Sequence, residues 1–354
     1  MRYRQRLFGA VLTSLLAGTA CSPPPLPPAE LHTDAAPNAA RSAAKGPYLY
    51  VAGEALSEYA VGSSKPLRTA KPAHQVTALA LDRFGNLFVR EIYGSLAGEI
   101  QVFNAFDLRL KRTIKNPPLL ASAMVTDADG YLYVASDVGV WVYPPGGDRA
   151  ADRLRPQWGI EALEFDAFSN LYAGAGSRVG IFAPTYVAGH LKFERAVRKG
   201  IHFLDTLALA PSGDLFAANC YSCIYSSPPH PDSVTVYAQG GSTPLLHVRD
   251  GISGPQALAI DAGTELYVAN EPSPSGSSTP GWISVYASGS VRPARRITNH
   301  VDGPVALALD PAQKLYVANA RSSSVSVYGP GGAKFLYRIT KGIRGAAAML
   351  IGSP

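Results

Sequence analysis

The sequence predicts an all-β fold, a β-propeller in which seven four-stranded sheets, called blades below, close into a ring. A strand–turn–strand pattern recurs along the chain, as expected for a repeat architecture. Its copies are spaced by about 44 residues, the length of one four-stranded blade. The two ends of the chain also hold complementary halves of one copy. The alternative, a ring of six blades, requires one of the copies to be spurious.

Each copy has an apolar first strand, a polar turn and an aromatic-rich second strand. The clearest ones are ALALDPAQKLYVAN (Ala306–Asn319) and ALAIDAGTELYVAN (Ala257–Asn270). A third strand follows each of them, VSVY (Val325–Tyr328) and ISVY (Ile283–Tyr286) respectively. Short alternating runs bounded by Gly, Asp, Asn and Pro favour strands over helices. The earlier copies begin at Ala78, Ala123, Ala162 and Thr206.

The seventh copy is divided between the two ends of the repeat region. Leu49–Gly53 has the pattern of a second strand that no first strand precedes. Ala346–Ile351 has the pattern of a first strand that no second strand follows. Because a closed ring joins its last unit to its first, we expect these two strands to pair in one shared blade.

A fourth strand follows each third strand, and most of its charged residues are basic. This strand is the outer edge of its blade, where charges discourage edge-to-edge association. A nucleic-acid site would instead gather basic and stacking residues on one face, so we expect no nucleic-acid partner. These basic residues are Arg68, Arg109, Lys111, Arg112, Arg153, Arg155, Lys192, Arg195, Arg198, Arg249, Arg295, Arg296 and Arg338.

Two further residue types recur with the repeat. An aspartate closes most first strands, where its carboxylate can accept hydrogen bonds from turn amides. An aromatic residue ends each third strand and is expected to pack between blades. The aspartates are Asp82, Asp127, Asp166, Asp261 and Asp310, and the aromatic residues are Tyr59, Phe103, Tyr143, Phe182, Tyr237, Tyr286 and Tyr328.

The LYVAN segments with their VTVY or VSVY partners resemble the NHL and YVTN-type propeller repeats. The resemblance covers nearly everything from Gly46 onward. It implies the propeller fold and leaves the function open, because such propellers include binding scaffolds, lactonases, lyases and enzyme subunits. Function must therefore come from the site and not from the ring.

The first 20 residues are typical of a secretory signal. Three arginines precede the apolar stretch Leu7–Gly18, which is too short to span a bilayer as a helix. The segment LLAGTAC ending at Cys21 resembles the lipobox of bacterial lipoproteins, although Gly18 stands where that pattern usually has Leu or Val. The resemblance implies that Cys21 is acylated and becomes the new N-terminus. Removing the three arginines lowers the formal net charge from +6 to +3 (6 − 3).

Three segments result from this interpretation. Residues 1–20 are the signal peptide, residues 21–46 are the anchor cysteine with a Pro- and Ala-rich tether, and residues 47–354 are one propeller domain. We expect the protein in the bacterial cell envelope, as an outer-membrane lipoprotein or otherwise outside the cytoplasm. Its membrane contact would run through the lipid anchor.

The loops between second and third strands vary in length, with insertions at Glu91–Glu99, Asn219–Ser233 and Asn270–Trp282. They emerge on the same face as the connections into each next first strand. We expect any binding site on this variable face, near the central opening. The candidate ligand-binding residues there are Glu161, His202, Asp205, Gln256, Asp302, Arg344, Asn219, Asn270 and Asn319.

Glu161, His202 and the three LYVAN asparagines could supply oxygen and nitrogen ligands to a divalent cation. Propeller lactonases and lyases use such a cation to polarise a carbonyl group. Alternatively, each asparagine caps its loop through hydrogen bonds from its side chain to the backbone. No other cofactor is predicted. The sequence contains no GxSxG, HExxH or phosphate-cradling GxxxxGK motif.

Cys220 and Cys223 are the two cysteines that follow Cys21. In an oxidising compartment they are expected to form a disulfide that stiffens the Asn219–Ser233 insertion. A redox role and a zinc site with His230 are the alternatives.

The leading functional hypothesis is a monomeric, non-catalytic scaffold that binds an envelope protein, a glycan or a small ligand. The alternative is a metal-dependent lactonase or lyase with its site at the central opening.

Overall fold

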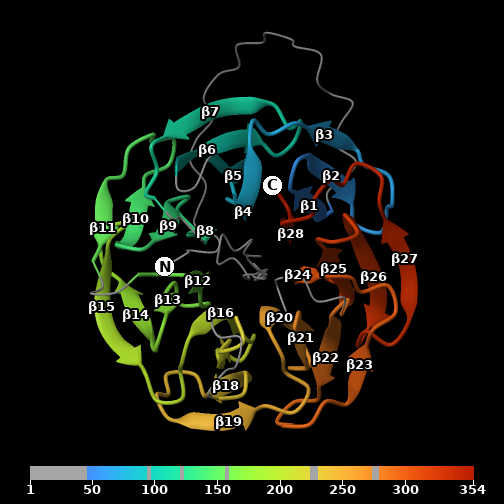
Figure 1. Ribbon diagram of the computed structural model, residues 1–354. Helices are drawn as coiled ribbons and strands as arrows, with labels where there is room; N and C mark the ends of the chain where they lie inside the picture. The colour runs from blue at the N-terminus through green and yellow to red at the C-terminus, as the bar shows by residue number, and fades with distance from the viewer. Residues whose placement is uncertain (1–45, 94–96, 120–122, 156–158, 224–229, 273–278) are drawn as a thin grey trace, which may run out of the picture.

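The computed structural model describes residues 46–93, 97–119, 123–155, 159–223, 230–272 and 279–354. These residues form 28 strands in seven four-stranded antiparallel sheets arranged as a ring (Figure 1). The fold is thus the seven-bladed β-propeller that the repeats predict, and the six-bladed alternative is wrong. The described residues contain no helix long and apolar enough to cross a membrane.

The first strands lie nearest the centre of the ring and the fourth strands lie outermost. From blade 1 to blade 7, the first strands are β28 (Ala348–Gly352), β4 (Gln75–Leu81), β8 (Met124–Thr126), β12 (Ala162–Phe165), β16 (Leu204–Leu209), β20 (Pro255–Ile260) and β24 (Pro304–Leu309). The second strands are β1 (Tyr48–Ala52), β5 (Asn86–Tyr93), β9 (Leu132–Ser136), β13 (Leu171–Ala175), β17 (Leu215–Asn219), β21 (Leu266–Asn270) and β25 (Lys314–Asn319). The third strands are β2 (Leu56–Ala60), β6 (Ala97–Asn104), β10 (Gly139–Tyr143), β14 (Arg178–Pro184), β18 (Ser233–Tyr237), β22 (Trp282–Tyr286) and β26 (Ser324–Pro330). The fourth strands are β3 (Arg68–Ala70), β7 (Leu110–Lys115), β11 (Asp152–Leu154), β15 (Leu191–Val197), β19 (Pro244–Val248), β23 (Arg295–Ile297) and β27 (Phe335–Ile339).

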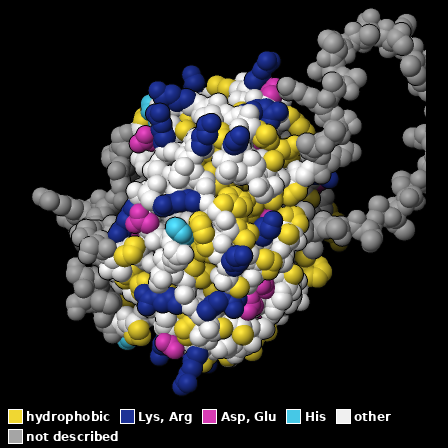
Figure 2. Space-filling view, turned by 90° about the vertical axis from the view of Figure 1, so that its right-hand side faces the viewer, with side chains coloured by type: hydrophobic (Ala, Val, Ile, Leu, Met, Phe, Trp, Pro, Cys, Tyr) yellow, Lys and Arg dark blue, Asp and Glu magenta, His cyan; other side chains and the backbone are white. Residues whose placement is uncertain are grey.

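The outer edge of the ring carries basic side chains in every blade, either on the fourth strand or directly beside it. Arg296 on β23 and Arg338 on β27, for example, are exposed. Figure 2 shows the ring from one side, where Lys and Arg side chains are spread among apolar and uncharged ones and do not gather in one patch. This distribution fits charges that protect strand edges from pairing with other chains.

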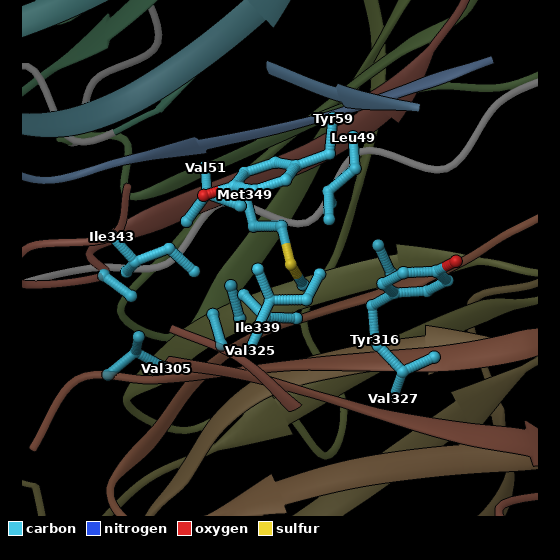
Figure 3. Packing of buried hydrophobic residues seen from close by; sticks show 14 residues of the cluster. Leu49, Val51, Tyr59, Val305, Tyr316, Val325, Val327, Ile339, Ile343 and Met349 are labelled. Carbon is cyan, nitrogen blue, oxygen red and sulfur yellow. The ribbon is translucent and has the colours of Figure 1, made fainter. Parts of the chain in front are cut away.

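Blade 1 closes the ring. Its first strand β28 comes from the C-terminal end of the chain and pairs with β1 over five residues, from Tyr48 opposite Gly352 to Ala52 opposite Ala348. The pairing of Leu49–Gly53 with Ala346–Ile351 is thereby confirmed, with the strand ends shifted by one or two residues. A buried cluster joins blade 1 to blade 7, where Met349 and Tyr59 pack with Val325 and Ile339 (Figure 3).

The third-strand aromatic residues pack between blades, as the repeat predicts. Each belongs to the buried cluster that its blade shares with the preceding blade. The same clusters contain an aromatic residue from the second strand of that preceding blade. Between blades 6 and 7, for example, Tyr267 and Tyr328 share one cluster. Each interface between blades therefore buries two rings, which supply much of its apolar area.

The first-strand aspartates organise the turns that follow them. Asp82 Oδ1 accepts hydrogen bonds from the N–H groups of Phe84 and Asn86, at 2.9 and 2.8 Å. Asp166 holds its own turn in the same way. Asp261 accepts from Glu265 N–H and also from the hydroxyl of Tyr267, so the turn is joined to an interblade ring.

A buried asparagine ends the second strand in each of blades 5, 6 and 7. Asn319 Oδ1 accepts a hydrogen bond at 2.9 Å from the N–H of Asp302, in the loop that leads into the blade. Its Nδ2 donates to Ser326 Oγ on the third strand. Asn219 and Asn270 accept from the N–H groups of His202 and Ser253, again 17 residues earlier. We call this arrangement the loop clamp.

Third-strand hydroxyl groups complete the loop clamp. In blade 6, Ser284 Oγ and the Tyr286 hydroxyl donate to two successive carbonyl groups of the incoming loop, those of Gly251 and Asp250. Blades 1, 5 and 7 contain the same pair of bonds. The chain turns sharply at this point, with positive φ angles at Gly200, Gly251, His300 and Gly342. The clamp thus fixes the path of the loop that precedes the first strand.

Blade 2 has a glutamate in the place of the asparagine. Glu91 Oε2 accepts the N–H of His74 at 2.8 Å, while its other oxygen accepts no hydrogen bond from the described residues. Burial raises the pKa of Glu91 to about 7, and the nearby carboxylate of Glu99 also raises it. The Arg90 guanidinium beside it is buried and donates to backbone carbonyls. The predicted Glu91–Glu99 loop is wrong in part, because β5 and β6 extend into it and pair as far as Tyr93 and Ala97.

Replacing Asn319 by alanine removes the acceptor for Asp302 N–H and leaves buried polar groups without partners. We expect the free energy of unfolding to fall by about 1–3 kcal/mol. Urea denaturation followed by tryptophan fluorescence measures the change. Asn299→Ala is the matched control: this side chain is exposed, and only its backbone carbonyl receives the Tyr328 hydroxyl. Its effect should stay within about 0.5 kcal/mol, and equal losses in both variants would contradict the clamp.

Glu91 should make stability depend on pH. Its pKa is about 7 in the folded protein and near the ordinary 4.5 in the unfolded chain. As the pH rises, the Glu91 carboxyl therefore loses its proton first in the unfolded chain. The stabilisation that protonated Glu91 gives the folded protein is fully present below pH 4.5 and is lost as the pH rises towards 7. The expected loss is on the order of 1–3 kcal/mol.

Glu91→Gln should reduce this slope, because the amide oxygen still accepts His74 N–H and carries no charge; the raised pKa of buried Glu164 leaves a slope of the same sign. Urea unfolding of both proteins between pH 4 and 8 measures it. Glu194→Gln, at an exposed position, controls for the loss of one carboxylate. An unchanged slope in Glu91→Gln would contradict the assignment to Glu91.

Candidate binding site on the loop face

The ring has two faces with different connections. The second strands lead to one face, which carries the second-to-third-strand loops and the connections into the next blade; we call it the loop face. The hydrogen bonds of the clamp join these two kinds of connection, as between Asn270 and Ser253. The opposite face carries the turns that join first to second strands and third to fourth strands, and we call it the turn face.

The three LYVAN asparagines do not point their polar atoms at the central opening. Their side chains are at most 1% exposed, and the amide oxygens accept backbone N–H groups. These hydrogen bonds are the ones expected if each asparagine caps its loop and does not bind a cation. Among the described residues, no group of three or more His, Cys, Asp or Glu side chains could hold a metal ion.

The candidate residues Glu161, Asp205 and Gln256 occupy equivalent positions in blades 4, 5 and 6. Each stands at the start of a first strand, beside the central opening. Asp205 and Gln256 are the extra residues of β-bulges, where β16 and β20 shift their pairing with the second strands. Glu161 directly precedes β12 and donates its N–H to the Gly174 carbonyl. These three positions are neighbours around the ring, because β12, β16 and β20 belong to successive blades.

The longest described elaboration of the loop face belongs to blade 5. Cys220 and Cys223 form a disulfide with their Cα atoms 5.3 Å apart. Asp232 is buried and accepts hydrogen bonds from the N–H and the hydroxyl of Ser222, between the two cysteines. It also accepts the N–H of Gly254 in blade 6, at 2.7 Å. The carboxylate thus fastens the disulfide loop to the neighbouring blade.

Aromatic and imidazole rings surround Tyr221 in this loop. Its ring centroid lies 5.1 Å from that of Phe203, 5.2 Å from His230 and 6.2 Å from His202. Tyr221 is buried, whereas the other three are exposed. We call these four residues the ring cluster. Gln256 lies beside it, donating from Nε2 to Cys223 Sγ at 3.6 Å.

Two further titratable side chains lie in blades 5 and 4, the exposed His247 and the buried Glu164. His247 Nδ1 lies 3.2 Å from Thr235 Oγ1 of the blade 5 clamp. Burial holds the pKa of His247 below its usual value, and the positive charge of Arg249 lowers it further, which favours the neutral ring. Between blades 4 and 5, Glu164 is fully buried and accepts Leu209 N–H, and burial raises its pKa.

A salt bridge ties the next two blades together on the same face. Arg321 of blade 7 donates to Glu271 Oε1 through Nε and Nη2, at 3.1 and 2.8 Å. It also donates to the Thr279 carbonyl, across the blade 6 insertion. Glu271 is largely buried, so this pair links the blades more firmly than an exposed pair would.

The structure brings only part of the predicted set together. His202 and Gln256 lie at the disulfide loop of blade 5, through contacts with Tyr221 and Cys223. Asp302 and Arg344 belong to the incoming loops of blades 7 and 1, where their backbone groups take part in hydrogen bonds. Cys21 lies outside the described residues. Nothing in the repeat marks Phe203, Tyr221, Asp232 or the Glu271–Arg321 pair as part of a site, so these residues are apparent only in the structure.

The comparisons with known proteins agree with the fold. No protein-family model matches the chain, and no curated protein does. Among solved structures, a protein from Lactobacillus plantarum superposes with a TM-score of 0.66 at 16% sequence identity. The match covers 86% of this chain and 99% of that one. At this level of identity the likeness shows the β-propeller fold alone.

Proposed function

We propose that this protein is a lipid-anchored scaffold of the bacterial envelope that binds a partner polypeptide or glycan through the ring cluster on its loop face. The supporting observation is the exposure of His202 and Phe203 in the loop that enters blade 5, next to the exposed His230 of the insertion that a disulfide and the buried Asp232 hold in place. A rigid surface of aromatic and imidazole rings binds with little loss of side-chain entropy.

The proposal assigns binding and no chemical step. The clamp asparagines are engaged by the backbone, and Asp232 is engaged by Ser222 and Gly254. The exposed residues of the ring cluster can contact a partner through ring faces and imidazole nitrogens. The LYVAN repeats further support a place among the NHL and YVTN-type propellers, whose common feature is a ring that presents loops.

The anchor part of the proposal rests on the lipobox-like segment before Cys21 and the tether of residues 22–46. An acylated cysteine would hold the propeller at a membrane while leaving the ring outside the bilayer.

Cys21→Ser should release the protein from membranes, because serine offers no thiol for acylation. We expect the wild-type protein in the membrane fraction and most of the variant in the soluble envelope fraction. Labelling with a radioactive or alkyne-bearing fatty acid should mark only the wild type. Cys220→Ser combined with Cys223→Ser is the control, since it alters two cysteines and leaves the anchor. Unchanged fractionation and no fatty-acid label in the wild type would remove the anchor from the proposal.

The ring cluster should be the part of the ring that touches the partner. A photo-reactive benzoylphenylalanine at position 203, introduced in living cells, should give a discrete crosslinked product on irradiation. The same group at Leu336, a 40% exposed position on the outer edge of blade 7, serves as the control and should give none. His202→Ala combined with His230→Ala should weaken the product at position 203 about tenfold. Identical products at positions 203 and 336 would contradict a loop-face partner.

A further inference from the structure

The turn face exposes large aromatic side chains, although short turns need none. Phe84 is 51% exposed, Phe106 56%, Phe168 65% and Tyr186 109%, the last being fully extended into solvent. All four lie in turns of blades 2 and 4, and Val187 beside Tyr186 is 59% exposed. Scattered exposed apolar residues are ordinary, but several on neighbouring turns of one face indicate a contact surface.

Contacts between rings and glycines make this surface continuous across blade 3. The Phe106 ring covers Gly85, where an added Cβ would meet it at 2.6 Å. The Phe84 ring covers Gly130 in blade 3, and the Tyr131 ring of blade 3 covers Gly189 in blade 4. Each ring thus lies on a neighbouring turn. We call Phe84, Phe106, Phe168, Tyr186 and Val187 the aromatic arc.

The fold itself does not require these aromatic residues. Phe84 and Phe168 each stand two residues after a first-strand aspartate, Asp82 or Asp166. The same position holds Ser212, Gly263 and Ala312 in blades 5, 6 and 7. Asp82 binds backbone amides in this turn, which any residue provides. The aromatic side chains are therefore specific to one side of the turn face and are not part of the repeat.

The chain enters the ring on this same face. β1 begins at Tyr48, which pairs with Gly352 and Ala60 at the turn-face end of blade 1. Blade 1 adjoins blade 2, where the arc begins, through a shared buried cluster. Residues 22–46 connect this point to Cys21, and 25 residues span at most about 90 Å. A tether of this reach holds the turn face close to any membrane that carries the anchor and raises its local concentration there.

We propose that the aromatic arc is a membrane-contact surface, which seats the turn face of blades 2–4 on the lipid interface and directs the loop face away from it. The proposal rests on the anchoring proposed above, because the tether brings this face to the bilayer. Phenylalanine and tyrosine rings favour the boundary between headgroups and acyl chains. Arg83, whose guanidinium lies 4.8 Å from the Phe84 ring centroid, and the exposed Arg109 can reach lipid phosphates from the edges of the arc.

Partition of the unacylated protein into vesicles tests the arc separately from the anchor. The parent is the full chain with Cys21→Ser, mixed with phosphatidylethanolamine and phosphatidylglycerol vesicles at a ratio of about 3 to 1. In the arc variant, Phe84, Phe106, Phe168 and Tyr186 are also replaced by serine. We expect at least tenfold weaker co-flotation of the arc variant. Both proteins carry the same N-terminal segment, so the difference reports the arc alone.

The matched control replaces Leu245 and Leu336 by serine, two exposed apolar residues on the outermost strands of blades 5 and 7. It should bind vesicles like the parent. Equal flotation of parent and arc variant overturns the proposal. The proposal is also overturned if the arc variant floats like the parent but self-associates less than the parent in the absence of lipid. In that case the arc would join two copies of this chain. Failure of the anchor appears instead as missing acylation of Cys21 in the wild type, with the flotation difference intact.

A single substitution provides a second test, which does not depend on whether the arc variant with its four substitutions folds. Phe168→Trp, in the acylated protein reconstituted into vesicles, places an indole at the tip of the arc. Lipids brominated high on the acyl chain should quench its fluorescence beyond that of the native tryptophans. Leu336→Trp should gain no such quenching. Equal quenching at both positions, or none at position 168, overturns the proposal.

Discussion

The closure of the ring is the constraint on which the rest of this structure depends. β28 and β1 lie at opposite ends of the described chain, and their pairing gives every blade two neighbours. Without it, the cluster joining blades 7 and 1 would be exposed. The added loop-closure entropy, relative to a contact within one blade, is only about 2 kcal/mol, because it grows with the logarithm of loop length. One interblade cluster is enough to offset it.

Closure also explains a departure from the repeat. In blade 1 Gly53, directly after β1, stands where blades 5 to 7 have the clamp asparagine, and Glu54 N–H donates to the Arg344 carbonyl beside it. A Cβ at position 53 would lie 1.7 Å from the Gly345 carbonyl oxygen. The returning C-terminal segment therefore passes where a side chain would stand, and only glycine allows it. The backbone itself replaces the asparagine as the partner of the incoming loop.

The loop clamp and the aspartate turns give the molecule two faces that are built in different ways. The turns are short because Asp82 and its equivalents satisfy their amides locally, which leaves tip positions free to vary. The clamps hold the incoming loops of the other face, so insertions such as Cys220–Cys223 rest on a fixed base. Partner binding on the loop face and lipid contact on the turn face are compatible for this reason, because neither surface is needed to close the ring.

The sequence by itself determined the strands, the blade count and the shared blade, because alternation and repeat spacing set the register within each blade. It also predicted candidate ligand-binding residues near the opening, among them Asp205 and Gln256, which stay a prediction. Only the tertiary structure decided which blades become neighbours and hence which side chains meet: Asp232 with Gly254, Glu271 with Arg321, and Tyr221 with His230. Those contacts join loops from different blades or distant parts of one loop. Their geometry follows from how the closed ring packs, which no local pattern in the chain records.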